Sequence, residues 1–328
     1  MKKIVCLGGG NAMPKTVLTG LKNYPVKITV ICSTLDSGGS SGRLREEFKV
    51  ISFGDLRRAF LALSNTSSQI KELFNFRFQK DELKGHNFGN IFLVVLFLSK
   101  KGNYDKTFNE IKKFLKISHD VLPATLSNSN LYAILENGKI IKGETNIDIP
   151  KHNGNLKIKK VFLRPKAKIY SKAIEAIKRA NLIVFGPGDL YSSLTQILLI
   201  EGISKAIKKS KAKKIFICNL MTKYGETNNF TVLDFTKEIE KYLGKNLDYV
   251  IYNNFIPAKR RIESYKKAHP ELLDLVKIEK KLPKDYNPPT TLPFSRAPKF
   301  IGKNLLLKKG PVEHESKKIA KILISLCR

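Results

Sequence analysis

Five apolar runs along the chain show no alternation between apolar and polar positions, and each ends in glycine, asparagine, aspartate or threonine. They are KIVCLGGG, KITVICSTLD, NLIVFGPGD, KIFICNLMT and DYVIYNN, which end at residues 8–10, Asp36, residues 186–189, residues 219–222 and residues 253–254. Continuous apolar runs are typical of strands that are buried on both faces of a parallel sheet. The first four are each followed by helix-forming residues. The pattern therefore predicts an α/β fold, a three-layer Rossmann-like sandwich with a mainly parallel sheet.

The chain between the second and third of these runs predicts two helices and a hairpin. Residues 90–100 are almost entirely apolar and predict a buried helix, and residues 104–117 predict another helix. The segment LYAILENGKIIKGET predicts a β-hairpin insertion, with Asn137 and Gly138 in a type I′ turn because both tolerate a positive φ.

The pattern is weaker from residue 256 onward. The segment LPKDYNPPTTLPFSRAPK is rich in proline and irregular, whereas KNLLL predicts a returning strand and residues 316–326 predict a closing helix. We therefore expect a single α/β domain over residues 1–328, with a less regular insertion at about residues 256–300.

The carboxyl ends of parallel strands share one edge of a sheet, so the polar ends of the five runs converge in space. Ligands of open α/β sheets bind in the crevice outside that edge. The stretch STLDSGGSSGRL, residues 33–44, has the composition of a flexible linker but lies between a predicted strand and a predicted helix. Its position predicts that glycine is needed there for close approach of the backbone to a ligand.

Composition and net charge indicate which partners and which compartment to expect for this protein. The formal net charge of +32 raises nucleic acid or an anionic membrane as a partner, but 49 of the 60 basic residues are lysines spread over helix-like stretches. This favours a solvated surface, so we do not expect nucleic acid as a partner. The four cysteines predict buried thiols in a reducing compartment, and no apolar run approaches the roughly 20 residues of a membrane span. We expect a cytoplasmic protein without membrane insertion.

Several polar signatures at the predicted edge have the chemistry of a binding site. The loop GGGNAMPKTVL offers backbone N–H groups to phosphate, although the third glycine of a dinucleotide fingerprint falls at Met13, and a purely structural tight turn is the alternative. Asp36 can accept hydrogen bonds from a ribose or sugar hydroxyl, join a metal shell, or cap the next helix. Arg57 can bind phosphate or lie on a helix surface.

The histidines and the remaining motifs predict neither a metal site nor a catalytic residue. His86 precedes an apolar helix and is predicted to be a cap or a hydrogen-bond partner instead of a base. The histidines have no HxxxH spacing, so no zinc site is predicted, and no nucleophile elbow points to a catalytic residue.

Eight motifs in order carry a family resemblance: GGGNA, DSGGSSGRLR, GDLRRAF, GHNFGN, VLPAT, GETNI, GPGDLYSSL and CNLMTKYGET. The series resembles the CofD-like family, and within it the YvcK or gluconeogenesis-factor branch, over about residues 1–255. The resemblance implies a cytoplasmic Rossmann-like protein. In the YvcK branch it implies binding of UDP-sugars such as UDP-N-acetylglucosamine and a role in cell shape and wall growth on gluconeogenic carbon sources. In the CofD branch it implies transfer of a phospholactyl group to a deazaflavin during coenzyme F420 biosynthesis.

The predicted ligand-binding residues are those at which the family motifs fall or that lie beside them. They are Gly8, Gly9, Gly10, Asn11, Asp36, Gly38, Gly39, Ser40, Ser41, Arg43, Asp55, Arg57, Asn90, Gly186, Gly188, Asn219 and Thr222. The chain departs from the family pattern at Asn11 and Ala12, where Thr-Gly is usual, at Ser37, where a second aspartate is usual, and at Asp189, where serine is usual. The usual Arg-His-Asp of the tail reads Glu313, His314 and Glu315, which places a contribution of the tail to ligand binding in doubt.

These observations lead to one expected function and two alternatives. We expect a regulatory protein that binds a UDP-sugar or a related phosphorylated small molecule, without a resident cofactor or metal and without a predicted catalytic residue. A CofD-like transferase that uses Mg²⁺, in which Asp36 would hold the metal or an acceptor hydroxyl, is the second possibility. A nucleic-acid binder is the third and depends on charge alone. The sequence identifies no protein partner and leaves a homodimer open.

Overall fold

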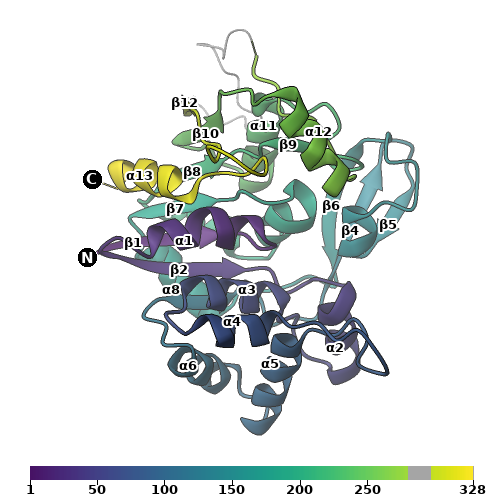
Figure 1. Cartoon of the computed structure of the whole chain (residues 1–328), viewed down its shortest axis with the longest axis vertical. Coiled ribbons are helices and arrows are strands. Elements are labelled where there is room, and N and C mark those ends of the chain that lie inside the picture. Colours follow the sequence, from purple (N-terminus) through teal and green to yellow (C-terminus); the bar gives the residue numbers. More distant parts are fainter. Residues whose placement is uncertain (280–296, 328) are drawn as a thin grey trace.

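A parallel sheet of seven strands forms the centre of the computed structural model, which describes residues 1–279 and 297–327 (Figure 1). In sheet order the strands are β12 (Lys299–Lys303), β10 (Tyr249–Asn253), β8 (Lys213–Ile217), β7 (Leu182–Phe185), β1 (Lys2–Leu7), β2 (Val26–Cys32) and β3 (Asp120–Pro123). All six neighbouring pairs are parallel, and Ile4 of β1 pairs with Ile28 on one side and Leu182 on the other. The α/β prediction is confirmed.

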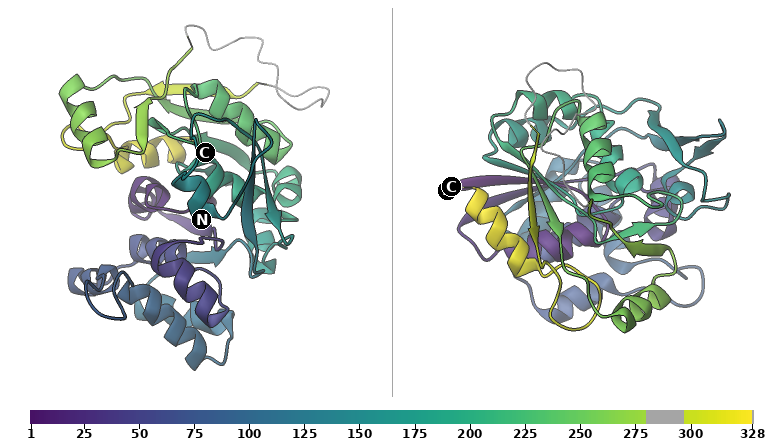
Figure 2. Two further views of the ribbon diagram at one scale, coloured as in Figure 1. Left: turned by 90° about the vertical axis from the view of Figure 1, so that its right-hand side faces the viewer. Right: turned by 90° about the horizontal axis from the view of Figure 1, so that it is seen from above.

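Helices cover both faces of this sheet, as the two views of Figure 2 show. One core contains side chains of η1 (Pro14–Leu18), α1 (Thr19–Leu21), α2 (Gly39–Phe48), α3 (Gly54–Leu63), α4 (Ser68–Asn75), α5 (Phe88–Ser99), α6 (Tyr104–Phe114) and α13 (Ser316–Leu326). The other contains side chains of α8 (Ser171–Lys178), η2 (Leu190–Thr195), α9 (Gln196–Leu198), α10 (Ile203–Lys209) and α11 (Val232–Leu243). The segments η1 and η2 are π-helical and start the connections that follow β1 and β7.

Two small antiparallel sheets extend this sandwich. One has the order β5 (Ile140–Lys142), β4 (Asn130–Leu135), β6 (Ile158–Arg164), and α7 (Glu144–Asp148) follows β5 directly. The other pairs β9 (Met221–Lys223) with β11 (Leu272–Leu275), and α12 (Lys259–Ala268) lies between β10 and β11 in the chain. The predicted hairpin is therefore present as the β4–β5 pair.

The turn of this hairpin is not of type I′. Gly138 has a φ of +85°, but Asn137 does not share the positive φ that a type I′ turn requires at both positions. The N–H of Gly138 donates to the carbonyl of Leu135, which closes a turn around residues 136–137 before the left-handed glycine. This is the three-residue hairpin loop, in which only the last residue needs glycine.

Two further predictions about elements are wrong. The last strand is β12, which ends where KNLLL begins, and Leu305 and Leu306 are buried in a loop outside any strand. The apolar run in that segment reflects burial alone. Helix α5 was predicted to be buried, but Val95 and Leu98 are 57% and 50% exposed because the helix covers the core with one side only.

The remaining predictions concern two helices, the cysteines, the irregular segment and a membrane span. The helices predicted over residues 104–117 and 316–326 are present, and Cys6, Cys32, Cys218 and Cys327 are buried free thiols. Most of the irregular segment LPKDYNPPTTLPFSRAPK lies outside the described residues. None of the helices within residues 1–279 and 297–327 has the length and apolar character that a bilayer span requires.

Candidate functional site

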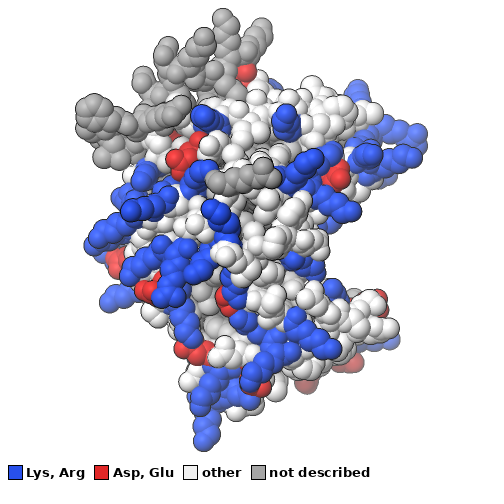
Figure 3. Space-filling view, turned by 90° about the vertical axis from the view of Figure 1, so that its left-hand side faces the viewer, with Lys and Arg blue, Asp and Glu red and all other residues white. Residues whose placement is uncertain are grey.

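A cleft of about 1100 Å³ lies at the carboxyl edge of the large sheet. Its walls come from the loops after β1, β2, β7 and β8, from α3 and α7, and from the segment before α13. Figure 3 shows a hollow on the right-hand margin of the molecule, between an upper and a lower lobe. The predicted residues that line the cleft are Gly9, Gly10, Asn11, Asp36, Gly38, Gly39, Ser40, Ser41, Asp55, Arg57, Asn90, Gly188 and Asn219.

Four predicted residues lie outside the lining of the cleft: Gly8, Arg43, Gly186 and Thr222. The guanidinium of Arg43 donates to the backbone carbonyl of Lys84 at 2.7 Å. The hydroxyl of Thr222 bonds to the backbone of Asp274 and thereby joins β9 to β11. These two side chains are committed to the scaffold, and the two glycines shape the loops behind the cleft.

Asp55 anchors the glycine loop that follows β1. Its Oδ1 accepts the N–H of Gly10 at 2.9 Å and also pairs with Arg58. A Cβ at Gly9 would lie 1.6 Å from Asp55 Oδ2, so the aspartate occupies the space that any side chain at residue 9 would need. Gly10 has a φ of +63°, and the nearest atom to a Cβ there would be Ser193 Oγ at 3.9 Å. Gly9 is therefore required for packing, whereas Gly10 faces open space.

The glycines after β2 also fall into two groups, those packed against protein atoms and one that faces open space. A Cβ at Gly38 would lie 2.3 Å from Thr145 Oγ1, and a Cβ at Gly42 would lie 2.3 Å from the carbonyl of Ser37. Gly39 has a φ of +52°, and nothing lies within 4 Å of the position of its Cβ. We predicted close approach to a ligand at all three positions. Only Gly39 has the open surroundings that such an approach needs, and the other two are packed against protein.

The serines of this loop turn their side chains into the protein. Ser40 Oγ accepts the N–H of Asn87 at 3.0 Å and lies 3.3 Å from His86 Nδ1, while Ser41 Oγ accepts from Asn90 Nδ2 at 3.1 Å. His86 is thus a hydrogen-bond partner, as predicted. Helix α2 has no side-chain cap, and within the described residues the amides 39–41 have no protein acceptor. The cleft therefore contains the amino end of a ten-residue helix, a favourable place for an anion.

Arg57 is buried and holds the scaffold together. Its Nε donates to Asn90 Oδ1 at 3.0 Å, and its Nη1 donates to Asn75 Oδ1 at 2.6 Å and to the carbonyl of Phe74 at 3.0 Å. Burial, together with the neighbouring Arg58 and Arg77, lowers the pKa of Arg57 to about 10. Through Asn90 this guanidinium fixes Ser41 at the start of α2.

A pair of carboxyl groups faces the cleft beside the Gly/Ser loop. Asp36 Oδ1 accepts the N–H of Gly38 at 2.9 Å, and Glu144 of α7 accepts a hydrogen bond from the hydroxyl of Thr145 at 3.2 Å. Burial and the nearby Asp36 raise the pKa of Glu144 to about 9, and burial also raises the pKa of Asp36. Glu144 therefore holds its proton at neutral pH, and the closeness of the two acids disfavours two negative charges at this site.

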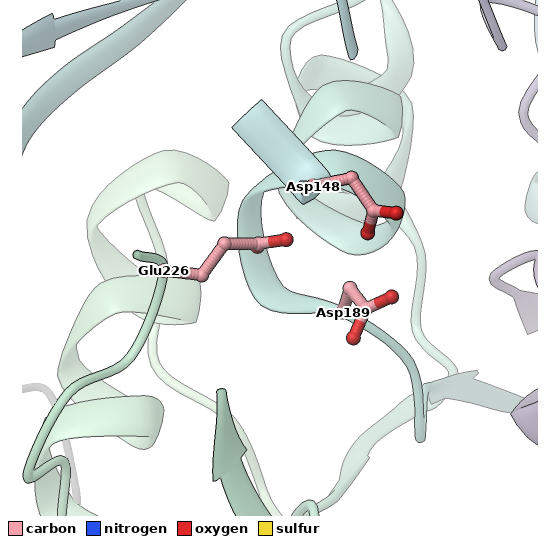
Figure 4. Close-up of side chains that lie close together, drawn as sticks. All are labelled: Asp148, Asp189 and Glu226. Carbon is pink, nitrogen blue, oxygen red and sulfur yellow. The ribbon is translucent and has the colours of Figure 1, made fainter. Parts of the chain in front are cut away.

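Three further carboxylates converge from separate segments (Figure 4). Asp148 ends α7, Asp189 precedes η2, and Glu226 follows β9. Lys223 pairs with Asp148 and lies 3.2 Å from Asp189 and 3.6 Å from Glu226. Burial opposes the charge of Lys223, but the three acids outweigh it and raise its pKa. The ammonium of Lys223 therefore pairs with all three members of a cluster that has the spacing of a metal site, and offsets part of its negative charge.

Glu226 also fixes the start of η2. Its carboxylate accepts the N–H of Tyr191 at 2.8 Å and the hydroxyl of Ser192 at 2.7 Å. Burial raises the pKa of Asp189 to about 7 even though Lys223 lowers it. Lys223, which pairs with both side chains, holds the carboxylates of Asp148 and Asp189 at the cleft wall.

The tail before α13 forms part of the cleft despite its departure from the family pattern. Glu313 and His314 both line the cleft, and Glu313 pairs with Lys15 at 2.6 Å across 298 positions of sequence. Burial lowers the pKa of His314 to about 4, so this histidine is neutral. Asn219 lines the same end of the cleft, where its Nδ2 donates to the carbonyl of Gly188 at 2.9 Å.

Five residues of the site were not predicted from the sequence: Arg58, Glu144, Asp148, Lys223 and Glu226. Arg58 lies beside Arg57 in GDLRRAF, and helical periodicity alone does not show which of two adjacent arginines faces inward. Glu144 falls in GETNI, a motif that we quoted without selecting a residue from it. Asp148 carried no motif signal of its own, and the role of Lys223 and Glu226 depends on contacts across more than 30 residues.

The fold and the position of the cleft define a doubly wound α/β protein whose main cleft lies where such sheets receive ligands. The model of the family 2-phospho-L-lactate transferase CofD matches residues 4–286. The gluconeogenesis factor of Bacillus subtilis is 34% identical over 333 residues, which cover 99% of this chain and 98% of that protein. The gluconeogenesis factor of Listeria innocua is 40% identical over 255 residues, which cover 76% and 77%.

A solved structure agrees with these relatives. The crystal structure of a UPF0052 family member from Bacillus halodurans superposes with a TM-score of 0.88 at 33% identity, covering 99% of this chain and 100% of that one. The chain belongs to the CofD family, in the branch that contains the gluconeogenesis factors. The family resemblance of the eight motifs is confirmed.

Proposed function

We propose that this protein binds a nucleotide sugar of the UDP-sugar type in the cleft and acts as a regulator instead of a catalyst. The observation that carries the proposal is the uncapped amino end of α2 in the cleft, beside Gly39 with its open surroundings. Backbone N–H groups and the helix dipole stabilise a phosphate at such a position, and a missing Cβ lets it approach.

The rest of the cleft suits the sugar part of such a ligand. Asp148 and Asp189 offer carboxylate oxygens to hydroxyl groups, and Ser193 adds a hydroxyl. A cleft of about 1100 Å³ has room for a whole nucleotide sugar, since drug-sized ligands occupy roughly 300–1,000 Å³. The relatives are named gluconeogenesis factors, which supports a role on gluconeogenic carbon sources. Under the proposal, the protein senses the nucleotide sugar and adjusts cell shape and wall growth.

Calorimetry with UDP-N-acetylglucosamine tests the proposal directly. We expect saturable binding of one ligand per chain, and weaker binding of UMP, which lacks the second phosphate and the sugar. Ser193→Ala should weaken binding of the UDP-sugar more than that of UMP, whereas Ser325→Ala, a change of the same size on α13, should alter neither. No heat and no change in thermal unfolding with any of these ligands would refute the proposal.

The transferase alternative has one observation in its favour. The carboxyl pair of Asp36 and Glu144 lies in the cleft and can accept the proton of an acceptor hydroxyl. A divalent cation at Asp148, Asp189 and Glu226 would have to compete with the ammonium of Lys223, which already pairs with all three. Incubation with a deazaflavin alcohol, an activated phospholactate donor and Mg²⁺ should give no product by mass spectrometry. Steady turnover that Asp36→Asn abolishes would establish the transferase instead.

A further inference from the structure

An exposed apolar tip lies beside a strongly basic surface at the outer end of the upper lobe. Ile256 is 78% exposed and Phe255 is 45% exposed, and both belong to the loop between β10 and α12. Pro257 is buried and fixes the base of this loop. Exposed side chains of this size in a short loop leave apolar surface in contact with water. A partner that covers this surface removes it from water, which is favourable.

Two segments far apart in the sequence build this surface together. The N–H of Asn254 donates to the carbonyl of Lys303 at 3.0 Å, and Leu305 N donates to Asn253 Oδ1 at 3.1 Å. The guanidinium of Arg261 donates to the carbonyls of Leu307, Gly310 and Pro311 at 2.6–2.9 Å. Residues 254–268 and 299–311 therefore form one continuous surface.

The charge of these two segments is far from that of the whole chain. They contain nine basic residues and a single acid, Glu263, whereas the chain has 60 basic and 28 acidic residues. Besides Lys299 at the start of β12, the exposed cations are Lys259, Arg260, Lys267, Lys303, Lys308 and Lys309. Figure 3 shows blue side chains gathered on the projecting upper right, where α12 lies. We call Phe255, Ile256 and these six cations the α12 surface.

We propose that the α12 surface docks on the surface of a bilayer that contains anionic phospholipids. Phe255 and Ile256 enter the boundary between headgroups and acyl chains, and the six cations contact lipid phosphates around them. An apolar anchor and a basic cluster act together here, because stable attachment to a membrane takes two signals of this kind. Nucleic acid would match the charge and could stack a base on Phe255, but it would leave Ile256, the more exposed of the two side chains, in water.

The position of this surface connects it with the cleft. Tyr265 and His269 of α12 and its C-terminal flank line the cleft, as do Val312 and Glu313, which directly follow the second segment. A bilayer bound to the α12 surface would therefore lie next to one wall of the cleft. The inference stands on the loop and its charge, and does not depend on which ligand the cleft binds.

Sedimentation of the full chain with vesicles tests the proposal. Binding is expected to vesicles of phosphatidylcholine with phosphatidylglycerol and not to phosphatidylcholine alone. Replacing Lys259, Arg260, Lys308 and Lys309 by glutamine should weaken binding at least about 100-fold, because each cation near such a surface contributes about 1 kcal/mol. Phe255→Ser combined with Ile256→Ser should weaken it about tenfold or more.

A matched control separates this surface from net charge. Replacing Lys205, Lys208, Lys209 and Lys211 by glutamine removes the same four charges from exposed positions on and after α10. This variant should bind anionic vesicles within about threefold of the wild type, and circular dichroism verifies that every variant is folded.

Four outcomes would overturn the proposal. The first is no binding of the wild type to anionic vesicles, and the second is equal losses in the charge variant and its control. The third is a wild-type dimer that Phe255→Ser and Ile256→Ser convert to a monomer in light scattering, which would make the surface a contact between copies. Oligonucleotide binding that the charge variant abolishes while vesicle binding persists unchanged would also contradict it.

Discussion

Replacing Gly39 by asparagine separates ligand approach from loop packing. Gly39 has a φ of +52°, and its Cβ would meet no atom within 4 Å, so the folded protein has room for the new side chain. Asparagine tolerates the left-handed region better than other non-glycine residues, and we expect a stability loss of at most about 1 kcal/mol. The side chain would project into the cleft, where a phosphate is proposed to bind.

The expected loss of affinity is much larger than the loss of stability. Each charge-assisted hydrogen bond between a phosphate and an N–H group contributes about 1.5–3 kcal/mol, so losing one or two lowers affinity about tenfold to more than 100-fold. Calorimetry with UDP-N-acetylglucosamine measures the affinity, and urea unfolding measures the stability. Gly138→Asn is the matched control, because Gly138 also has a positive φ and open surroundings but lies in the hairpin turn.

The two neighbouring glycines should behave in the opposite way. Gly38→Ala and Gly42→Ala each place a Cβ 2.3 Å from protein atoms and should destabilise the fold, by about 1–3 kcal/mol for such overpacking. Wild-type affinity in Gly39→Asn, with the hairpin control unchanged, would show that the amino end of α2 does not receive the ligand. Equal stability losses in Gly39→Asn and Gly42→Ala would show that packing explains all three glycines.

Three further predictions concern charge. Glu144 has a pKa of about 9 in the folded protein and about 4.5 in the unfolded chain, so the free energy of unfolding falls as the pH rises between these values. Glu144→Gln should reduce that fall when melting temperatures are compared across this pH range. An unchanged pH dependence would contradict this assignment. Lys223→Met leaves three carboxylates without their cation and should cost about 3–5 kcal/mol in urea unfolding, and an unchanged midpoint would refute this role. Oligonucleotide binding should be weak, without sequence preference and steeply reduced by salt; sequence-selective binding at physiological salt would overturn the nucleotide-sugar proposal.

The sequence predicted the parts of this fold that depend on local pattern. Strands β1, β2, β7, β8 and β10 are mostly apolar because both faces of the sheet are covered, and their continuous apolar runs are visible in the sequence. Apolar residues are ambiguous where burial arises from a loop, as for Leu305 and Leu306, so KNLLL indicated a strand that does not exist. Strand β12 itself, KFIGK, is bounded by lysines and contains a glycine, which weakens its signal.

The candidate site was predictable as a set of loops but not as a set of contacts. The carboxyl edge of the sheet collects Gly10, Asp36, Gly39 and Asn219, as the strand pattern implied. Whether an individual side chain faces the cleft or the scaffold depends on partners that are distant in sequence. Arg57 illustrates this, since three of its hydrogen bonds go to residues 17–33 positions away.

The central place of β1 in the sheet constrains how the chain matures during synthesis. Strand β1 leaves the ribosome shortly before β2, with which it pairs, but its other edge waits for β7, about 180 residues later. Helix α1 waits longer still, because Gly20 packs against the carbonyl of Ser316 in α13. Contacts of such long range are slow to form. A nascent chain therefore carries the glycine loop of the cleft long before it has the opposite wall. Ligand binding in the cleft thus indicates that the whole fold has formed.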